Sequence, residues 1–102
     1  MNHEHFSAYL DEAVEHMKTL MGSKNGEYAP GGDKLANFKK ASRMTGKSPE
    51  ECLWMFASKH IISIQDIVNA EGAYTPDALR EKCGDLRAYT VLLEALMQER
   101  HT

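Results

Sequence analysis

Apolar side chains recur every three or four residues over much of this chain, which is the period of a helix with one buried face. Residues 3 to 21 carry the first such stripe, with charged residues on the other side. The stripe consists of Phe6, Leu10, Ala13, Met17 and Leu20. The segment from 22 to 32 contains four glycines and a proline, so it predicts a loop that ends this helix.

A short second helix is predicted after the loop. Asp33 is a suitable N-cap for it, and Leu35, Phe38 and Met44 supply its apolar face. The stretch "TGKSP" ends it.

Two stronger start signals predict the remaining helices. Ser48, Pro49 and Glu51 supply a serine cap, a proline in the first helical turn and a capping-box acid, and the helix runs to about residue 70. A similar signal at residues 75 to 77 starts a helix that runs to about residue 100. No strand pattern or repeat is present, so residues 1 to 102 predict a single all-α domain, a compact bundle of four helices.

The third predicted helix has a histidine in its apolar arc. At 100° per residue this arc contains Leu53, Phe56, Ala57, His60, Ile64 and Ile67. Lys59, Ser63 and Asp66 lie along its flank as a polar seam. Two interpretations stay open: a hydrogen-bonded core histidine beside a solvated lysine, or a polar pocket.

The last predicted helix carries a main apolar stripe and a second, mixed face. The main stripe, predicted to be buried, is Leu79, Cys83, Leu86, Thr90, Leu93 and Met97. Glu81, Asp85 and Tyr89 project with Leu92 and Leu96. Carboxylates tilted toward a helix interface need a cation. Lys59 and Lys82 would supply it as plain salt bridges, and Mg²⁺ held by oxygen ligands is the other interpretation.

The composition restricts the classes of partner and the cellular location that can be expected. The chain has 12 basic and 15 acidic residues and a formal net charge of -3, and its lysines form no patch, which argues against double-stranded nucleic acid. Cys52 and Cys83 have no metal-site spacing and are interpreted as reduced, apolar core residues. No run approaches a membrane-spanning length and no targeting segment is recognisable, so a cytoplasmic protein without membrane contact is expected. Met55, Ile62 and Val91 point away from the predicted core, which predicts a homo-oligomer.

The loop and the start of the second helix add candidate ligand contacts. Tyr28 and Phe38 are suited to stack on a base, Lys24 to meet a phosphate, and Asn37 to read a base edge or hold the loop. Each also has an ordinary interpretation, with Phe38 in the core and Lys24 in solvent.

Three stretches in order, "KNGEYA...D.LANF", "KHIISIQDIV" and "EKCGDLRAYTVLLEAL", resemble a group of small phage-encoded helical proteins. That group is itself similar to the all-alpha NTP pyrophosphohydrolases, the MazG-like bundles. The resemblance spans residues 24 to 97 and implies a MazG-like fold and nucleotide recognition, in the host cytoplasm if the chain is phage-encoded. It implies ligand contacts at Lys24, Tyr28, Asn37, Phe38, Lys59, His60, Ser63 and Tyr89. It implies Mg²⁺ ligands at Asp66, Glu81 and Asp85.

The chain departs from the pyrophosphohydrolase pattern in one respect. Those proteins carry paired acids on two successive helices, whereas here Asp66 is the one acid in the seam of the third helix, and Lys59 or Ser63 stands where an acid is expected. Three functions therefore stay open: a divergent Mg²⁺-dependent pyrophosphohydrolase, a factor that binds or sequesters a nucleotide, and a non-catalytic interaction module that forms a helical oligomer.

Overall fold

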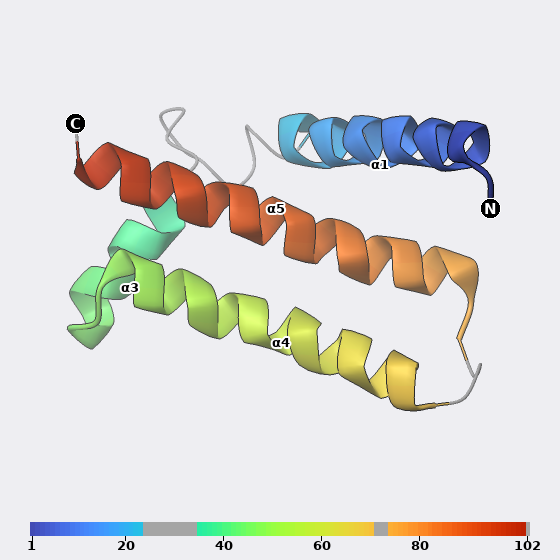
Figure 1. Ribbon diagram of the computed structural model, residues 1–102. Coiled ribbons are helices and arrows are strands. Elements are labelled where there is room, and N and C mark those ends of the chain that lie inside the picture. Colours follow the sequence, from blue (N-terminus) through green and yellow to red (C-terminus); the bar gives the residue numbers. More distant parts are fainter. Residues whose placement is uncertain (24–34, 71–73, 102) are drawn as a thin grey trace.

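The computed structural model describes residues 1–23, 35–70 and 74–101, which form four α-helices and no strand. The helices are α1 (His3–Ser23), α3 (Ala36–Thr45), α4 (Pro49–Asn69) and α5 (Pro76–Arg100) (Figure 1). The all-α prediction is confirmed, and the helix bounds predicted at 21, 70 and 100 lie within two residues of the observed ones. The predicted Asp33 cap lies outside the described residues. None of the described helices is long and apolar enough to cross a membrane.

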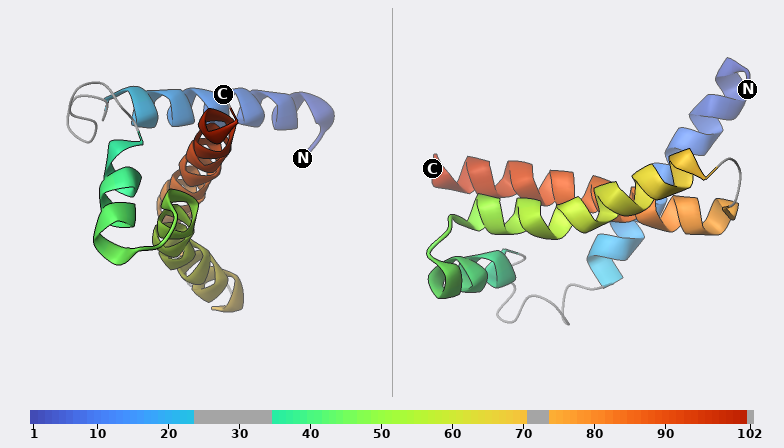
Figure 2. Two further views of the ribbon diagram at one scale, coloured as in Figure 1. Left: turned by 90° about the vertical axis from the view of Figure 1, so that its left-hand side faces the viewer. Right: turned by 90° about the horizontal axis from the view of Figure 1, so that it is seen from below.

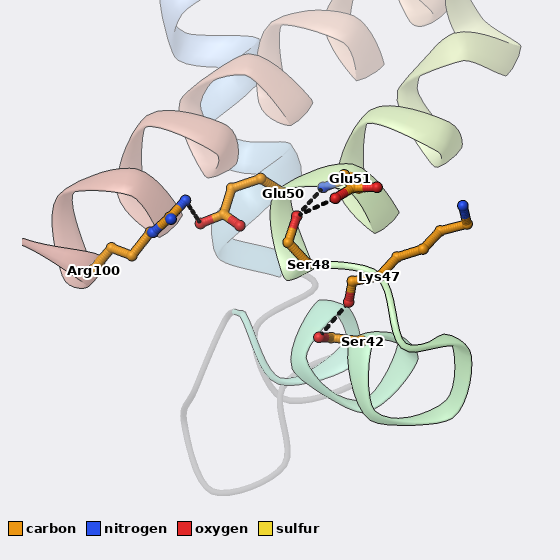
Figure 3. A network of polar contacts seen from close by, with 6 residues as sticks. All are labelled: Ser42, Lys47, Ser48, Glu50, Glu51 and Arg100. Carbon is orange, nitrogen blue, oxygen red and sulfur yellow. Dashed lines mark hydrogen bonds and ion pairs between the residues drawn. The ribbon is translucent and has the colours of Figure 1, made fainter.

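The start of α4 is fixed by its own side chains. The Ser48 hydroxyl accepts a hydrogen bond from the Glu51 N–H at 3.1 Å and donates one to Glu51 Oε1 at 3.2 Å (Figure 3). Thr75 performs the same capping role for α5, because its hydroxyl accepts from the Ala78 N–H at 3.1 Å. A proline in the first turn follows each cap. These contacts are local, which is why the sequence predicted both helix starts correctly.

A sharp turn joins α3 to α4. Gly46 ends α3 with φ of 76°, a left-handed conformation that glycine adopts without steric cost. Its N–H donates to the Ser42 carbonyl at 3.0 Å, and the Ser42 hydroxyl donates to the Lys47 carbonyl at 2.6 Å (Figure 3). Across the molecule, Arg100 at the end of α5 pairs with Glu50 at the start of α4 at 3.4 Å. The turn therefore sets α3 beside α4.

The helices pack in layers around a small core. Helices α4 and α5 run antiparallel, α3 packs on α4, and α1 packs on the other side of α5 (Figure 1). The buried apolar side chains are Leu35, Phe38, Cys52, Leu53, Ala57 and Leu96. Tyr89, Leu92 and Leu93 pack against this group, and Leu53 is the one large side chain that is fully buried among the described residues. The core therefore lies where α3, α4 and α5 meet.

Two stripes that were predicted to be buried are buried only in part. None of the six residues of the main α5 stripe is fully buried, because α5 turns the neighbouring arc, with Tyr89, Leu92 and Leu96, toward α3 and α4. On α1, Phe6 and Leu10 are exposed because this helix contacts mainly α5. The outward positions were predicted correctly: Met55, Ile62 and Val91 are all exposed.

The molecule is more open than a compact four-helix bundle. Its radius of gyration is 15.6 Å and its extents are 45 × 27 × 26 Å, whereas a compact domain of this length has a radius of about 13 Å. Helix α1 crosses α5, and its N-terminal end extends beyond the α4 and α5 pair (Figure 2). The excess size reflects this arrangement of helices.

The crossing of α1 over α5 depends on Gly84. This residue is buried, and a Cβ added to it would lie 2.9 Å from His16 Cε1 and 3.1 Å from His16 Nδ1. Nearby, His16 Nδ1 and Arg87 Nε are buried without a hydrogen-bond partner in the described part of the chain. Unsatisfied polar atoms weaken a contact. The close approach of the His16 ring to α5 therefore requires a residue without a Cβ at position 84.

The position of the core predicts that two Leu→Ala variants differ strongly in their free energy of unfolding. Leu53→Ala removes the fully buried side chain and is expected to lower the free energy of unfolding by about 2 to 5 kcal/mol. Leu10→Ala removes the same atoms from an exposed position in α1 and is expected to change it by less than about 0.5 kcal/mol. Urea denaturation of both variants measures this difference. Equal losses would contradict the observed position of the core.

The crossing predicts an energetic coupling between His16 and Gly84. In a His16→Ala background, Gly84→Ala is expected to stabilise the protein by roughly 1 kcal/mol, because alanine is the better helix former. In the native background the His16 ring must move first, so the gain is smaller or becomes a loss. Denaturation of the four proteins gives the coupling free energy. Additivity within about 0.5 kcal/mol would show that the two residues are independent.

Candidate functional site

The strongest candidate site is a cluster of aromatic and titratable side chains where α3, α4 and α5 meet. Phe56 and His60 are four residues apart on α4, and Asp85 and Tyr89 are four residues apart on α5. Residues at this spacing share one face of a helix. Because α4 and α5 are antiparallel neighbours, the two pairs come together, and Phe38 of α3 completes the group.

His60 is the centre of this cluster. Its Nδ1 lies 3.6 Å from Asp85 Oδ2, and its ring centroid lies 5.1 Å from that of Tyr89 with an interplanar angle of 36°. The side chains of His60 and Asp85 are 27% and 26% exposed. The contact is an ion pair when His60 is protonated. Both groups thus lie within reach of solvent while being held by protein contacts.

Three aromatic rings fix one another beside His60. The Phe38 centroid lies 6.1 Å from that of Phe56 and 6.4 Å from that of Tyr89, the latter in an edge-to-face arrangement. Phe38 is buried, whereas Phe56 is 41% exposed. The group therefore has a rigid inner ring and an outer ring that solvent reaches.

The local environment keeps Tyr89 protonated. Burial raises the pKa of this phenol above its ordinary value of 10.0, and the negative charge of Asp85 raises the pKa further. At neutral pH the cluster therefore contains a hydroxyl that is able to donate a hydrogen bond, beside a carboxylate that only accepts them.

Several predicted ligand residues lie elsewhere. Lys59 is exposed, and its side chain makes no ion pair or hydrogen bond with another described residue; Ser63 is half-buried. Asn37 is exposed at the start of α3. Lys24 and Tyr28 lie outside the described residues. Of the eight predicted ligand contacts, the structure brings Phe38, His60 and Tyr89 together.

The predicted metal ligands do not form one group. Asp66 and Glu81 are exposed, and Asp85 faces His60. The described ranges contain no group of three or more His, Cys, Asp or Glu side chains placed to hold one ion. Neither Lys59 nor Lys82 forms the predicted salt bridge to Glu81 or Asp85, because in those ranges Asp85 meets His60 instead.

Sequence reasoning missed Phe56 as part of the site. It was assigned to the core arc of its helix, whereas the residue is 41% exposed and its ring contacts Phe38. Its position one helical turn before His60 was the available signal. The cysteines differ as well: both are free, Cys52 is buried as predicted, and Cys83 is half-buried.

Comparison with known proteins assigns no family to this chain. No protein-family model, no curated protein and no solved structure matches the chain. The function is therefore inferred first from the chemistry of the cluster.

The raised pKa of Tyr89 predicts how stability depends on alkaline pH. The unfolded chain loses this proton near pH 10 and the folded chain at higher pH, so the stability contributed below pH 10 is lost as pH rises through the folded pKa. Tyr89→Phe is expected to show a shallower loss over this range, measured by urea denaturation. The control is Tyr74→Phe, at an exposed position, which is expected to keep the native slope. Identical slopes for both variants would contradict the environment assigned to Tyr89.

Proposed function

We propose that this chain binds a nucleotide or a nucleotide-like molecule at the cluster around His60. The observation that supports the proposal most is the combination at one partly exposed place of a carboxylate, an imidazole, a phenol and an accessible aromatic ring. Such a combination offers both stacking and hydrogen bonding to a heterocyclic base. The resemblance of three stretches of the chain to nucleotide-handling helical proteins favours the same function.

The aromatic side of the cluster is the better place for the base. Phe56 presents an exposed ring that Phe38 supports from behind. Stacking of a base on an aromatic side chain contributes about 1 to 3 kcal/mol and tolerates any base. The Asp85 carboxylate meets His60 through Oδ2 and retains acceptor capacity for an N–H group of the base.

The charges suggest where the phosphate lies. A phosphate placed against His60 would be repelled by the Asp85 carboxylate, because this carboxylate lies 3.6 Å from the imidazole. Lys59 is the next residue along α4, and its exposed ammonium has no carboxylate partner in the described part of the chain. We therefore assign the phosphate to Lys59 and the base to the aromatic side, in place of a joint phosphate contact by Lys59 and His60.

We propose binding of the nucleotide, and hydrolysis has to be measured separately. Of the three predicted Mg²⁺ ligands, Asp85 alone belongs to the cluster, so the carboxylates do not support a resident metal centre in the described ranges. In the proposed complex, Mg²⁺ would arrive bound to a di- or triphosphate. Ligand binding is therefore to be measured with and without Mg²⁺, together with assays for pyrophosphate release.

Titration calorimetry against nucleoside mono-, di- and triphosphates tests the two assigned contacts. Lys59→Ala is expected to weaken phosphate-dependent binding by about 1.5 to 3 kcal/mol, the size of a hydrogen bond to a charged group. Phe56→Ala is expected to lose about 1 to 3 kcal/mol irrespective of the phosphate chain.

Matched controls separate these effects from general damage. Lys40→Ala removes an exposed lysine from α3, and Phe6→Ala removes an exposed phenylalanine from α1, so both are expected to bind like the native chain. If each site variant binds with the same affinity as its control, the assignment is wrong. If no nucleotide raises the melting temperature of the native chain across the panel, nucleotide recognition itself is rejected.

A second candidate function is a non-catalytic interaction module. It is favoured by the many large apolar side chains that the helices expose, among them Trp54, Met55 and Ile62. Soluble monomers rarely expose contiguous apolar patches of large area. The failure of every nucleotide in the panel would leave this function as the better one.

A further inference from the structure

The apolar stripe that the sequence predicted to be buried on α5 is only partly buried. We call it the α5 seam, and its residues are Leu79, Cys83, Leu86, Thr90, Leu93 and Met97. Four of the six are half-buried and two are exposed, with Met97 at 46%. The spacing alternates between four and three residues along the whole seam. This is the spacing at which a helix packs along another helix in a coiled coil.

The neighbouring surface of α4 is apolar as well. Trp54, Ile61 and Val68 follow one another at seven-residue intervals, and Trp54 is 50% exposed. Trp54 and Met55 of α4 line a shallow groove of about 430 Å³ together with Leu93 of the α5 seam, and the charged residues at its edge are Lys47, Glu50 and Glu51. The seam and this stripe of α4 therefore meet at the groove, where Leu93 and Trp54 line the same surface.

This surface lies on the opposite side of the helix pair from α3. Phe56 faces α3 through its contact with Phe38, and Trp54 is two residues away, a rotation of about 200° around the helix. Figure 2 shows α3 on one flank of the α4 and α5 pair, whereas on the other flank the N-terminal half of α1 projects past α5 and no described helix runs along the pair. We call this second side the open flank.

We infer that a second copy of this chain covers the open flank, with the same surface of each copy packed on the other around a two-fold axis. The regular seam is the first reason, because its natural complement is another helix with the same spacing. The small core is the second: Leu93 packs against the core cluster and also lines the groove, so a second copy there would extend the core.

The size of the surface suits a small dimer interface. From Leu79 to Met97 the seam is about 27 Å long at 1.5 Å per residue, and two packed helices are about 20 Å wide, so the flat area of this face is about 540 Å². Its accessible area is larger because the side chains project from the helices, and it approaches the roughly 800 Å² that a stable interface commonly buries on each partner.

This inference gives the second candidate function a defined surface, and it does not depend on nucleotide binding. The mass of the full chain in solution tests it, by analytical ultracentrifugation over a wide range of concentrations. The expected species has twice the mass of the 11.5 kDa chain. Met97→Glu places a charge in the seam and is expected to weaken the dimer by about 10- to 100-fold, because the carboxylate loses its water on association.

Met44→Glu is the matched control. It makes the same substitution at a methionine of α3 that is 86% exposed and away from the open flank, and it is expected to leave the dissociation constant unchanged. Circular dichroism of both variants checks that the helices are retained.

Trp54 gives a local measurement, because it is the single tryptophan of the chain and lines the groove. Its fluorescence is expected to shift to longer wavelength, and its quenching by acrylamide to increase, when the native protein is diluted or carries Met97→Glu. Three results would overturn the inference: a monomer at every concentration, equal effects of the two glutamate variants, or unchanged Trp54 quenching on dissociation. An assembly larger than a dimer would overturn the closed two-fold arrangement.

Discussion

The antiparallel packing of α4 on α5 around Leu53 is the contact on which the rest of the structure depends. It places the one fully buried large side chain of the described residues at the centre of the core. Helix α3 adds Leu35 and Phe38 to that core, while α1 rests on the outer side of α5 and adds none of the buried residues. Loss of this packing would therefore separate α3 and α4 from α1 and α5, whereas loss of the α1 contact would leave the core in place.

The same packing creates the candidate site. In an antiparallel pair of helices, two residues four apart on one helix lie opposite two residues four apart on the other. His60 therefore meets both Asp85 and Tyr89. Phe38 belongs to the core and to the aromatic cluster at once. The floor of the site is thus as rigid as the core, and Phe56 supplies the accessible side.

The sequence predicted what is decided locally and failed where distant contacts decide. Ser48 and Thr75 bond to backbone N–H groups three residues later, so both helix starts could be predicted from a few residues. Helix α5, in contrast, has two apolar arcs, and periodicity cannot tell which one faces the neighbouring helix. The more regular arc was predicted to be the core, but Leu96 on the other arc is buried because α3 and α4 approach from that side. The predicted salt-bridge partners of Asp85 were wrong for the same reason. Asp85 meets His60 of α4, and not Lys59 or Lys82.

The two apolar arcs of α5 also relate the two proposed functions to each other. One arc faces α3 and carries Tyr89 of the candidate site, while the α5 seam lies on the open flank. A second copy on the open flank would leave Phe56 and His60 accessible, because both belong to the side that contains α3. Association through the seam would strengthen the packing of α4 on α5, which is the same packing that positions His60 against Asp85. Nucleotide recognition and self-association are therefore compatible in one molecule, and the second would support the geometry that the first requires.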